Sequence, residues 1–239
     1  MRVLFVQFEP DDGPGRLGDG LTALGVAVQS ARMDRGEALP SLDRYQGLIV
    51  MGGTMNALDD DHFPFLPLVV QIMRQAFQRG LPTLGVCLGG QLLARTLGAR
   101  VYRKETPEVG YYPVALTEAG QADPLFQNLP SRPITFQWHE DAFELPAGAT
   151  LLADSPRDSL QAFRMGASVG LQFHPEVSLE TLAIWAKSVA YGMAESVDQV
   201  TPESLLARGH AVDEQFAAQT TQICRNFHAM MRQEAIVRS

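Results

Sequence analysis

Hydrophobic residues in the first hundred positions alternate between short apolar runs and stretches in which leucine and alanine recur at three- and four-residue intervals. The runs have the length of buried strands, and the stretches have the period of amphipathic helices. Strands are expected at residues 2–8, 27–33, 47–51 and 81–86, and helices at residues 17–25, at 65–79 and directly after residue 87. Strands that alternate with helices predict a mainly parallel sheet with right-handed crossovers.

After Gly98 the pattern changes to short strand-like runs separated by turn residues. The runs cover residues 99–103, 110–116, 134–138, 150–153, 161–165 and 168–173. Such spacing predicts an antiparallel or mixed extension of the sheet. Residues 178–191 and 202–236 then return to helical spacing. We therefore expect one α/β domain over residues 1–195, with residues 196–239 forming a C-terminal helical extension packed on the same domain.

Composition limits the classes of function. The 239 residues are 46% hydrophobic and 19% charged, with a formal net charge of -8, which is typical of a soluble globular chain. An acidic chain without a basic cluster is a poor candidate for binding nucleic acid or an anionic membrane. The apolar N-terminal run is short and an acidic segment follows it, so it is interpreted as a strand and not as a signal peptide. No apolar run is long enough to span a bilayer.

The two cysteines indicate a cellular compartment and provide a candidate nucleophile. Cys87 and Cys224 are the only cysteines, so no disulfide framework is expected, and a free thiol fits a reducing, cytoplasmic compartment. Cys87 lies at the joint between an expected strand and an expected helix, with Gly85 before it and Gly89 and Gly90 after it. Small neighbours at such a joint are typical of a nucleophile elbow, and a helix N-terminus favours a thiolate. The alternative is a small buried core cysteine.

A thiol nucleophile needs a base, and the base needs an orienting group. Among five histidines, His174 stands at the end of a strand-like run and is followed by Pro175 and Glu176. Residues two apart in extended chain project to the same side, so Glu176 can accept from one imidazole nitrogen while the other faces the thiol. We therefore expect a triad of Cys87, His174 and Glu176. Taken alone, His174 would be interpreted as a satisfied core histidine, and it is Glu176 and Cys87 together that favour the triad.

These motifs resemble the class I glutamine amidotransferases, the triad glutaminase domains of enzymes such as GMP synthase and carbamoyl phosphate synthase. The resemblance rests on the glycine-bracketed Cys87, on Gly52 and Gly53 upstream, and on His174 and Glu176 downstream, and it extends to about residue 190. It implies a flavodoxin-like open sheet with helices on both faces. It also implies attack of the cysteine on a glutamine amide, a γ-glutamyl thioester, release of ammonia, and hydrolysis to glutamate.

The resemblance also implies further roles. The backbone N–H groups of Gly53 and Leu88 correspond to the oxyanion hole, and Gln91 corresponds to a side chain that holds the substrate. Family members often carry a Ser-His pair on a strand whose backbone receives the amino and carboxylate groups of the substrate. That place holds three further candidate substrate-binding residues, namely Gln137, Trp138 and His139. Trp138 departs from the usual serine, which leaves the substrate open, and the same residues could form an aromatic packing corner.

Two other patterns are expected to carry no function, and no cofactor or metal is expected. Gly13, Gly15 and Gly18 match the dinucleotide fingerprint, but the acidic residues before them would repel a pyrophosphate and Pro14 removes a backbone N–H. The acidic run Asp59-Asp60-Asp61 with His62 is interpreted as a solvated loop and not as a metal site.

Two functions compete with glutamine hydrolysis. The same triad could serve a γ-glutamyl peptidase or hydrolase that acts on another γ-glutamyl compound. A non-enzymatic redox or binding protein of the same fold is disfavoured, because a sensor thiol needs no oriented base. Only about sixty residues follow the triad, too few for a synthase domain of ordinary size. The expected partners are therefore a small-molecule substrate and, as one possibility, a separate ammonia-accepting synthase subunit.

Overall fold

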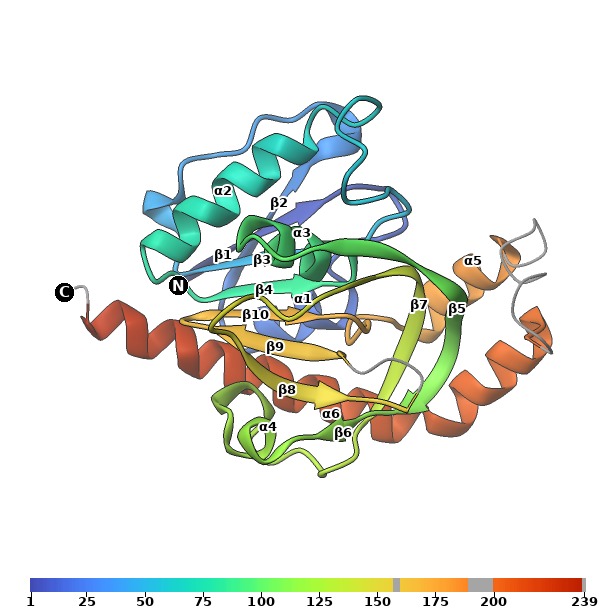
Figure 1. Ribbon diagram of the computed structural model, residues 1–239. Coiled ribbons are helices and arrows are strands. Elements are labelled where there is room, and N and C mark those ends of the chain that lie inside the picture. The colour runs from blue at the N-terminus through green and yellow to red at the C-terminus, as the bar shows by residue number, and fades with distance from the viewer. Residues whose placement is uncertain (157–159, 189–199, 238–239) are drawn as a thin grey trace.

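A computed structural model of the chain describes residues 1–156, 160–188 and 200–237 (Figure 1). Its centre is an eight-stranded sheet in the order β2-β1-β3-β4-β10-β9-β8-β6. The strands are β1 (Arg2–Gln7), β2 (Ala27–Arg32), β3 (Gly47–Val50), β4 (Thr83–Val86), β6 (Ala115–Leu116), β8 (Thr150–Asp154), β9 (Ala162–Met165) and β10 (Ser168–Leu171). The first five strands of this order are parallel and the last three join antiparallel, so the predicted flavodoxin-like sheet with an antiparallel extension is confirmed.

Helices cover both faces of the sheet. They are α1 (Gly15–Ala23), α2 (Leu66–Gln78), α3 (Leu88–Thr96), α4 (Glu118–Ala122), α5 (Leu179–Ser188) and α6 (Pro202–Val237), with short 3-10 turns η1 (Met33–Arg35), η2 (Leu42–Arg44) and η3 (Pro124–Phe126). In β1, Val3 and Phe5 face the core under α1 and α6, whereas Leu4 and Val6 face the core under α2 and α3. Burial on both faces explains why the inner parallel strands β1, β3 and β4 are mainly continuous apolar runs, whereas the edge strand β2 is more polar and more exposed.

The structure differs from the sequence-based expectation around residues 99–116. Two strands were expected there, but β5 (Val101–Pro113) is a single long strand that pairs antiparallel with β7 (Ile134–Phe143) as a separate two-stranded sheet. The register shifts between Arg103 and Glu108, where the polar sequence had suggested a loop. Lys104 and Glu108 are instead paired with each other at 3.2 Å and largely withdrawn from solvent, which keeps the polar segment within the strand. In Figure 1 this sheet stands at one end of the central sheet, beside α5.

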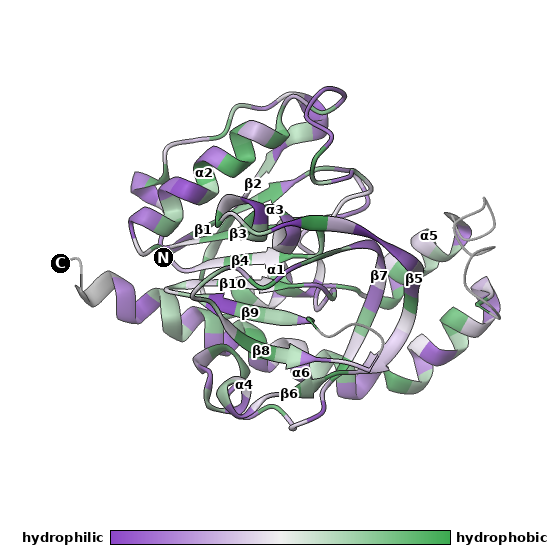
Figure 2. Cartoon of the chain, viewed as in Figure 1, coloured by the Kyte–Doolittle hydropathy of each residue, from purple (hydrophilic) through white to green (hydrophobic). Residues whose placement is uncertain are grey.

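The helical stretch expected at residues 202–236 is a single helix, α6, which packs on α1, α5 and η3. Phe216 in its first half contacts the β5–β7 sheet through Tyr111, and Ile223 and Phe227 in its second half join the core under the main sheet. In Figure 2 hydrophobic and hydrophilic positions mix along this helix, as expected when only one side is covered. The predicted boundary at residue 195 lies outside the described residues. No described helix has both the length and the hydropathy that crossing a bilayer requires.

Candidate active site

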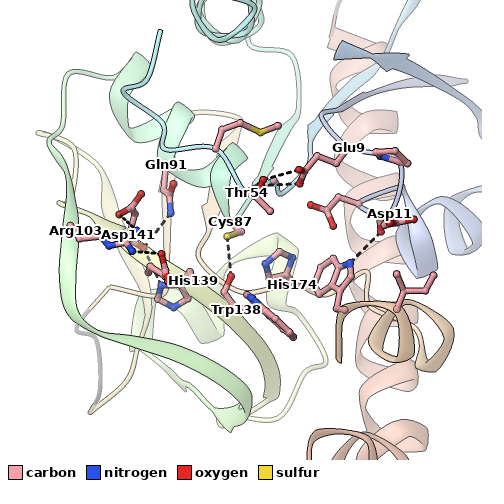
Figure 3. A pocket seen from close by; sticks show the side chains of 17 residues that line it. Glu9, Asp11, Thr54, Cys87, Gln91, Arg103, Trp138, His139, Asp141 and His174 are labelled. Carbon is pink, nitrogen blue, oxygen red and sulfur yellow. Dashed lines mark hydrogen bonds and ion pairs between the residues drawn. The ribbon is translucent and has the colours of Figure 1, made fainter. Parts of the chain in front are cut away.

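The candidate catalytic residues meet at the carboxyl ends of three adjacent parallel strands. Gly52 and Gly53 follow β3, Cys87 follows β4, and His174 lies three residues beyond β10. Strand order thus brings together segments that are more than a hundred residues apart in the chain. Open α/β sheets place their sites at this edge. Figure 3 shows Cys87 in the middle of a pocket there.

Cys87 sits on a strained strand-to-helix turn. Its backbone has φ 50° and ψ -106°, and α3 begins at the next residue. A side chain at Gly89 would put a Cβ atom 2.0 Å from the carbonyl oxygen of Val50, and one at Gly90 would put it 2.4 Å from the carbonyl oxygen of Leu171. The glycines are therefore required because α3 rests directly on the ends of β3 and β10. Positive φ at a non-glycine residue costs about 1–3 kcal/mol and is a feature of functional sites.

The Cys87 thiol is 5% exposed and has two polar neighbours. Its Sγ atom lies 3.8 Å from the carbonyl oxygen of Trp138 and 3.8 Å from Nε2 of Gln172. The backbone N–H of Cys87 donates to the carbonyl oxygen of Leu171 at 2.9 Å, which fixes the turn against β10. Gln172 was missed by the sequence analysis. Its position in the sequence could have identified it, because it stands two residues before His174, and residues at this spacing in an extended chain lie on the same side.

His174 and Glu176 form a buried pair. Nδ1 of His174 lies 2.7 Å from Oε1 of Glu176, and both side chains are only 3% exposed. His174 Nε2 makes no hydrogen bond to the described residues and lies in the pocket beside the thiol. Burial alone would lower the pKa of His174, but the nearby charges of Glu176 and Cys87 raise it well above its usual value of 6.5. The site therefore stabilises the protonated imidazole ring, which is the form that a base takes once it has accepted a proton from a nucleophile.

The segment expected to supply the oxyanion hole adjoins the nucleophile. A Cβ atom on Gly52 would lie 2.7 Å from Cε1 of His174, and one on Gly53 would lie 3.0 Å from Cδ2 of Leu88. Both glycines therefore permit close approach of this loop to the triad. The loop is held from the other side by Glu9, whose carboxylate accepts from the N–H of Thr54 at 3.0 Å and from its hydroxyl at 2.7 Å.

Of the four expected substrate-binding residues, Gln91, Trp138 and His139 line the pocket and Gln137 does not. Gln91 Nε2 donates to the carbonyl oxygen of Asp141 at 3.2 Å, so α3 is tied to β7. Gln137 is 1% exposed and donates to Thr135 and Gln161 instead.

Gln137 belongs to a buried polar network behind His139. Nε2 of His139 lies 3.1 Å from Oε2 of Glu108, which also pairs with Lys104, and Gln161 joins Glu108 to Gln137. Burial would raise the pKa of Glu108, but His139 and Lys104 lower it below its usual value. The charged network holds His139 at the pocket wall. Gln137 belongs to this network and does not itself line the pocket.

The two patterns expected to lack function have structural roles. A side chain at Gly15 would lie 2.4 Å from the carbonyl oxygen of Glu176, and the N–H of Arg16 donates to that oxygen at 2.8 Å. The glycine-rich segment therefore packs on the loop that carries the triad acid. In the acidic loop, Asp60 pairs with Arg95 at 2.5 Å and Asp59 with His62 at 2.6 Å. Within the described residues no group of three His, Cys, Asp or Glu side chains is arranged to hold a metal ion.

Acidic residues after β1 form a pocket wall that the sequence analysis did not assign to the site. Glu9, Asp11 and Asp12 all line the pocket, in a cavity of about 310 Å³. The pKa of Asp12 is raised to about 7, first by burial and then by the neighbouring carboxylates of Glu9 and Glu176, against an opposing effect of His174. Ionised Asp12 is thus costly to the folded chain.

This cost predicts a pH-dependent gain in stability for Asp12→Asn. A carboxyl whose pKa rises on folding destabilises the folded state above its unfolded pKa near 4, and the full effect is present above about pH 7. We expect the variant to unfold at a higher temperature than the native chain at pH 8, by about 2–4 °C per kcal/mol gained. The difference should shrink towards zero near pH 4. Thermal unfolding of both chains at the two pH values, with exposed Asp61→Asn as the control, measures this. An equal gain at both pH values would show that the Asp12 carboxyl is not the titrating group.

The chain also matches a known protein family. Residues 16–184 match the family model described as glutamine amidotransferase class-I. The chain is 33% identical over 187 residues to the glutamine amidotransferase-like protein YfeJ of Salmonella typhimurium, covering 76% of this chain and 78% of that protein. It is 38% identical over 134 residues to the glutamine-hydrolyzing GMP synthase of Thermomicrobium roseum, covering 56% of this chain but only 24% of the synthase.

Solved structures agree with the sequence matches. A crystal structure of a glutamine amidotransferase from Thermotoga maritima superposes with a TM-score of 0.87 at 30% identity, covering 95% of this chain and 97% of that one. One from Methylobacillus flagellatus gives a TM-score of 0.87 at 26% identity, covering 96% and 94% of the two chains.

Proposed function

The chain belongs to the class I glutamine amidotransferases, and from that premise we propose that it hydrolyses the γ-amide of glutamine through Cys87, His174 and Glu176. The observation that carries the proposal is the buried His174–Glu176 pair. With Nδ1 held by Glu176 at 2.7 Å, the unpaired Nε2 is left in the pocket beside the thiol. A redox thiol would have no use for an oriented base of this kind.

The first half of the reaction forms the thioester. His174 takes the thiol proton, and the Cys87 sulfur attacks the carbonyl carbon of the substrate's γ-amide, so that the carbonyl oxygen becomes an oxyanion. The backbone N–H groups of Gly53 and Leu88 are the proposed donors to this oxyanion, and loss of one such donor lowers rates by about 10²–10³. His174 then gives its proton to the amide nitrogen, the C–N bond breaks, and ammonia leaves.

The second half regenerates the enzyme. Water loses a proton to Nε2 of His174 and attacks the thioester carbon, the C–S bond breaks, and glutamate leaves while the thiol recovers its proton. Glu176 stabilises the imidazolium in both halves and keeps the ring in the tautomer that leaves Nε2 free for the thiol.

The fate of the ammonia follows from whether the chain acts alone. The GMP synthase of the comparison is glutamine-hydrolyzing, and the chain matches about a quarter of its length. We propose that the ammonia is either released or passed to a separate synthase subunit. An assay of the purified chain separates the two: rapid glutamine turnover alone supports release, and turnover that appears only with a co-purified protein supports a partner.

An affinity label tests the nucleophile directly. A glutamine-like diazoketone is expected to modify Cys87 and to spare Cys224. Burial, with a smaller effect of Asp19, raises the pKa of Cys224 to about 12, and its sulfur contacts the backbone of α1. Peptide mass spectrometry locates the adduct, and labelling of the unfolded chain serves as the control in which both cysteines react. Equal labelling of the folded chain at both positions would contradict an activated Cys87.

A further inference from the structure

The pocket is asymmetric in charge about Cys87. In Figure 3, Arg103, Gln91 and Asp141 lie on one side of Cys87, and His174, Glu9 and Asp11 lie on the other. We propose that the second side is a subsite for a cationic leaving group, so that the preferred substrate is an N-(γ-glutamyl) amide of an amine with a second, protonated amino group. This inference rests on the proposed cleavage by Cys87 and His174, and it specifies what departs.

The position of the acid sets the direction of the substrate. His174 must deliver a proton to the departing nitrogen, so the leaving group has to lie on the His174 side of Cys87. Any chain attached to that nitrogen therefore extends towards Glu9 and Asp11. The glutamyl part lies in the opposite direction.

The side of the pocket opposite His174 has the groups that can bind the α-amino and α-carboxylate groups of the glutamyl part. Arg103 is the one lysine or arginine among the described residues that line the pocket, and its guanidinium can receive the α-carboxylate. Its own charge is already balanced by ion pairs to Glu140 and, at 3.5 Å, to Asp141. Asp141 is only 7% exposed, and its carboxylate can bind an α-ammonium group. This side therefore offers both a guanidinium and a carboxylate, as binding of a zwitterion requires.

The leaving-group side has carboxylates that are not paired with a lysine or arginine. No salt bridge joins Glu9, Asp11 or Asp12 to a lysine or arginine within the described part of the chain, and among the described residues Arg103, on the opposite side, is the one lysine or arginine that lines the cavity. The two hydrogen bonds from Thr54 fix the Glu9 carboxylate in place. Burial raises the pKa of Asp12, and the neighbouring Glu9 carboxylate adds to this effect, although the charge of His174 opposes it. A protonated amine would supply the missing charge.

Two further features indicate that a ligand occupies this side. Among the residues that the structure describes, none makes a hydrogen bond to Nε2 of His174, although this side chain is only 3% exposed; the atom lies in the same cavity, so the subsite is continuous with the reacting centre. Trp185 forms the adjoining wall: its ring lies edge-on to His174 with centroids 5.1 Å apart, and its indole N–H donates to the carbonyl oxygen of Asp11 at 3.3 Å. An aromatic wall beside carboxylates binds a short methylene chain that ends in an ammonium group.

The reaction is balanced as for glutamine. The Cys87 sulfur forms a bond to the carbonyl carbon of the γ-glutamyl amide, the C–N bond breaks, and the proton on His174 goes to the nitrogen that leaves as the diamine. Water then cleaves the thioester, so the products are glutamate and a diamine. No oxidant, reductant or further reactant is required.

The test compares leaving groups of equal length and different charge. The substrates are L-glutamine and the γ-glutamyl amides of 1,4-diaminobutane, pentylamine and 4-aminobutyrate, with cationic, neutral and anionic ends. We expect kcat/KM to fall from the cationic to the neutral to the anionic amide, by about tenfold per step. In Asp12→Asn the ratio of cationic to neutral should fall about tenfold, and Asp12→Lys should favour the anionic amide. Exposed Asp61→Asn, outside the pocket, should leave the ratio unchanged.

A binding measurement separates failure of the subsite from failure of the catalytic proposal. Cys87→Ala protein is titrated calorimetrically with the cationic and neutral amides, and tighter binding of the cationic one, weakened by Asp12→Asn, is expected. Glutamine turnover with no preference for the cationic amide, in rate or in binding, overturns the subsite and leaves the glutaminase. Cationic preference in binding without cleavage of any substrate supports the subsite and overturns the proposed chemistry.

Discussion

Cys87→Ala is expected to lower kcat for glutamine by at least about 10⁴-fold while the chain remains folded. The sulfur is the atom that forms the thioester, and nothing else in the pocket replaces it. Cysteine and alanine both carry a Cβ atom, so the strain at φ 50° is the same in the two proteins and stability should change little. Ammonia release measured beside the thermal unfolding midpoint separates loss of chemistry from loss of fold.

The matched control is Cys224→Ala. Cys224 is also buried, but it contacts α1 and not the pocket, so its substitution should cost some stability and no activity. Glu176→Gln should lower kcat less than His174→Ala, because the acid orients the ring and does not carry the proton. Native turnover in pure Cys87→Ala protein would rule out the triad, and a larger loss at Glu176 than at His174 would reverse the assigned roles.

The parts of the fold that the sequence predicted are those that depend on local pattern. The inner parallel strands are buried on both faces and so are mainly apolar, and α2 has its hydrophobic residues on one side. The turn at Cys87 was also predictable, since its glycines mark close contacts that only glycine permits. His174 and Glu176 were found because their pairing needs only the alternation of an extended chain.

The parts that the sequence did not predict depend on contacts between distant segments. The polar residues 104–108 suggested a loop because their partners, His139 and Gln161, lie more than thirty residues away in the chain. Gln137 was expected in the pocket, but the network that holds it is visible only once β5 and β7 are paired.

The acidic pocket wall is the clearest example of a feature that the sequence did not predict. Glu9, Asp11 and Asp12 were noted only as unfavourable to a pyrophosphate, and their role depends on where β1 lies in the sheet. The carboxyl end of β1 is next to that of β3, so these carboxylates reach the triad, and Trp185 reaches them from α5. A motif search locates the chemistry in such a protein, whereas the leaving-group side is formed by residues with no fixed spacing from the nucleophile.

Gly89→Ala is expected to destabilise the chain by about 3 kcal/mol or more and to remove activity. The new Cβ atom would lie 2.0 Å from the carbonyl oxygen of Val50, a backbone atom in a core strand that cannot rotate away. Relief requires α3 to move off β3, which breaks the bond from the N–H of Gly89 to the carbonyl oxygen of Met51, now 3.1 Å long. The same movement displaces Leu88, a proposed oxyanion donor. Alanine gains only about 1 kcal/mol of helix propensity over glycine, which does not offset the overlap.

The control for this prediction is Gly13→Ala. There the nearest atom to the new Cβ is Nε2 of Gln7 at 3.4 Å, the end of a flexible side chain, so little change in stability is expected. Urea unfolding of both variants gives the free-energy differences, and glutamine turnover at a temperature where both are folded gives the activities. If Gly89→Ala unfolded at the native urea midpoint and kept native turnover, close packing of α3 on β3 could not be what positions the nucleophile. If it were destabilised but active while folded, the packing would serve the fold and not the oxyanion site.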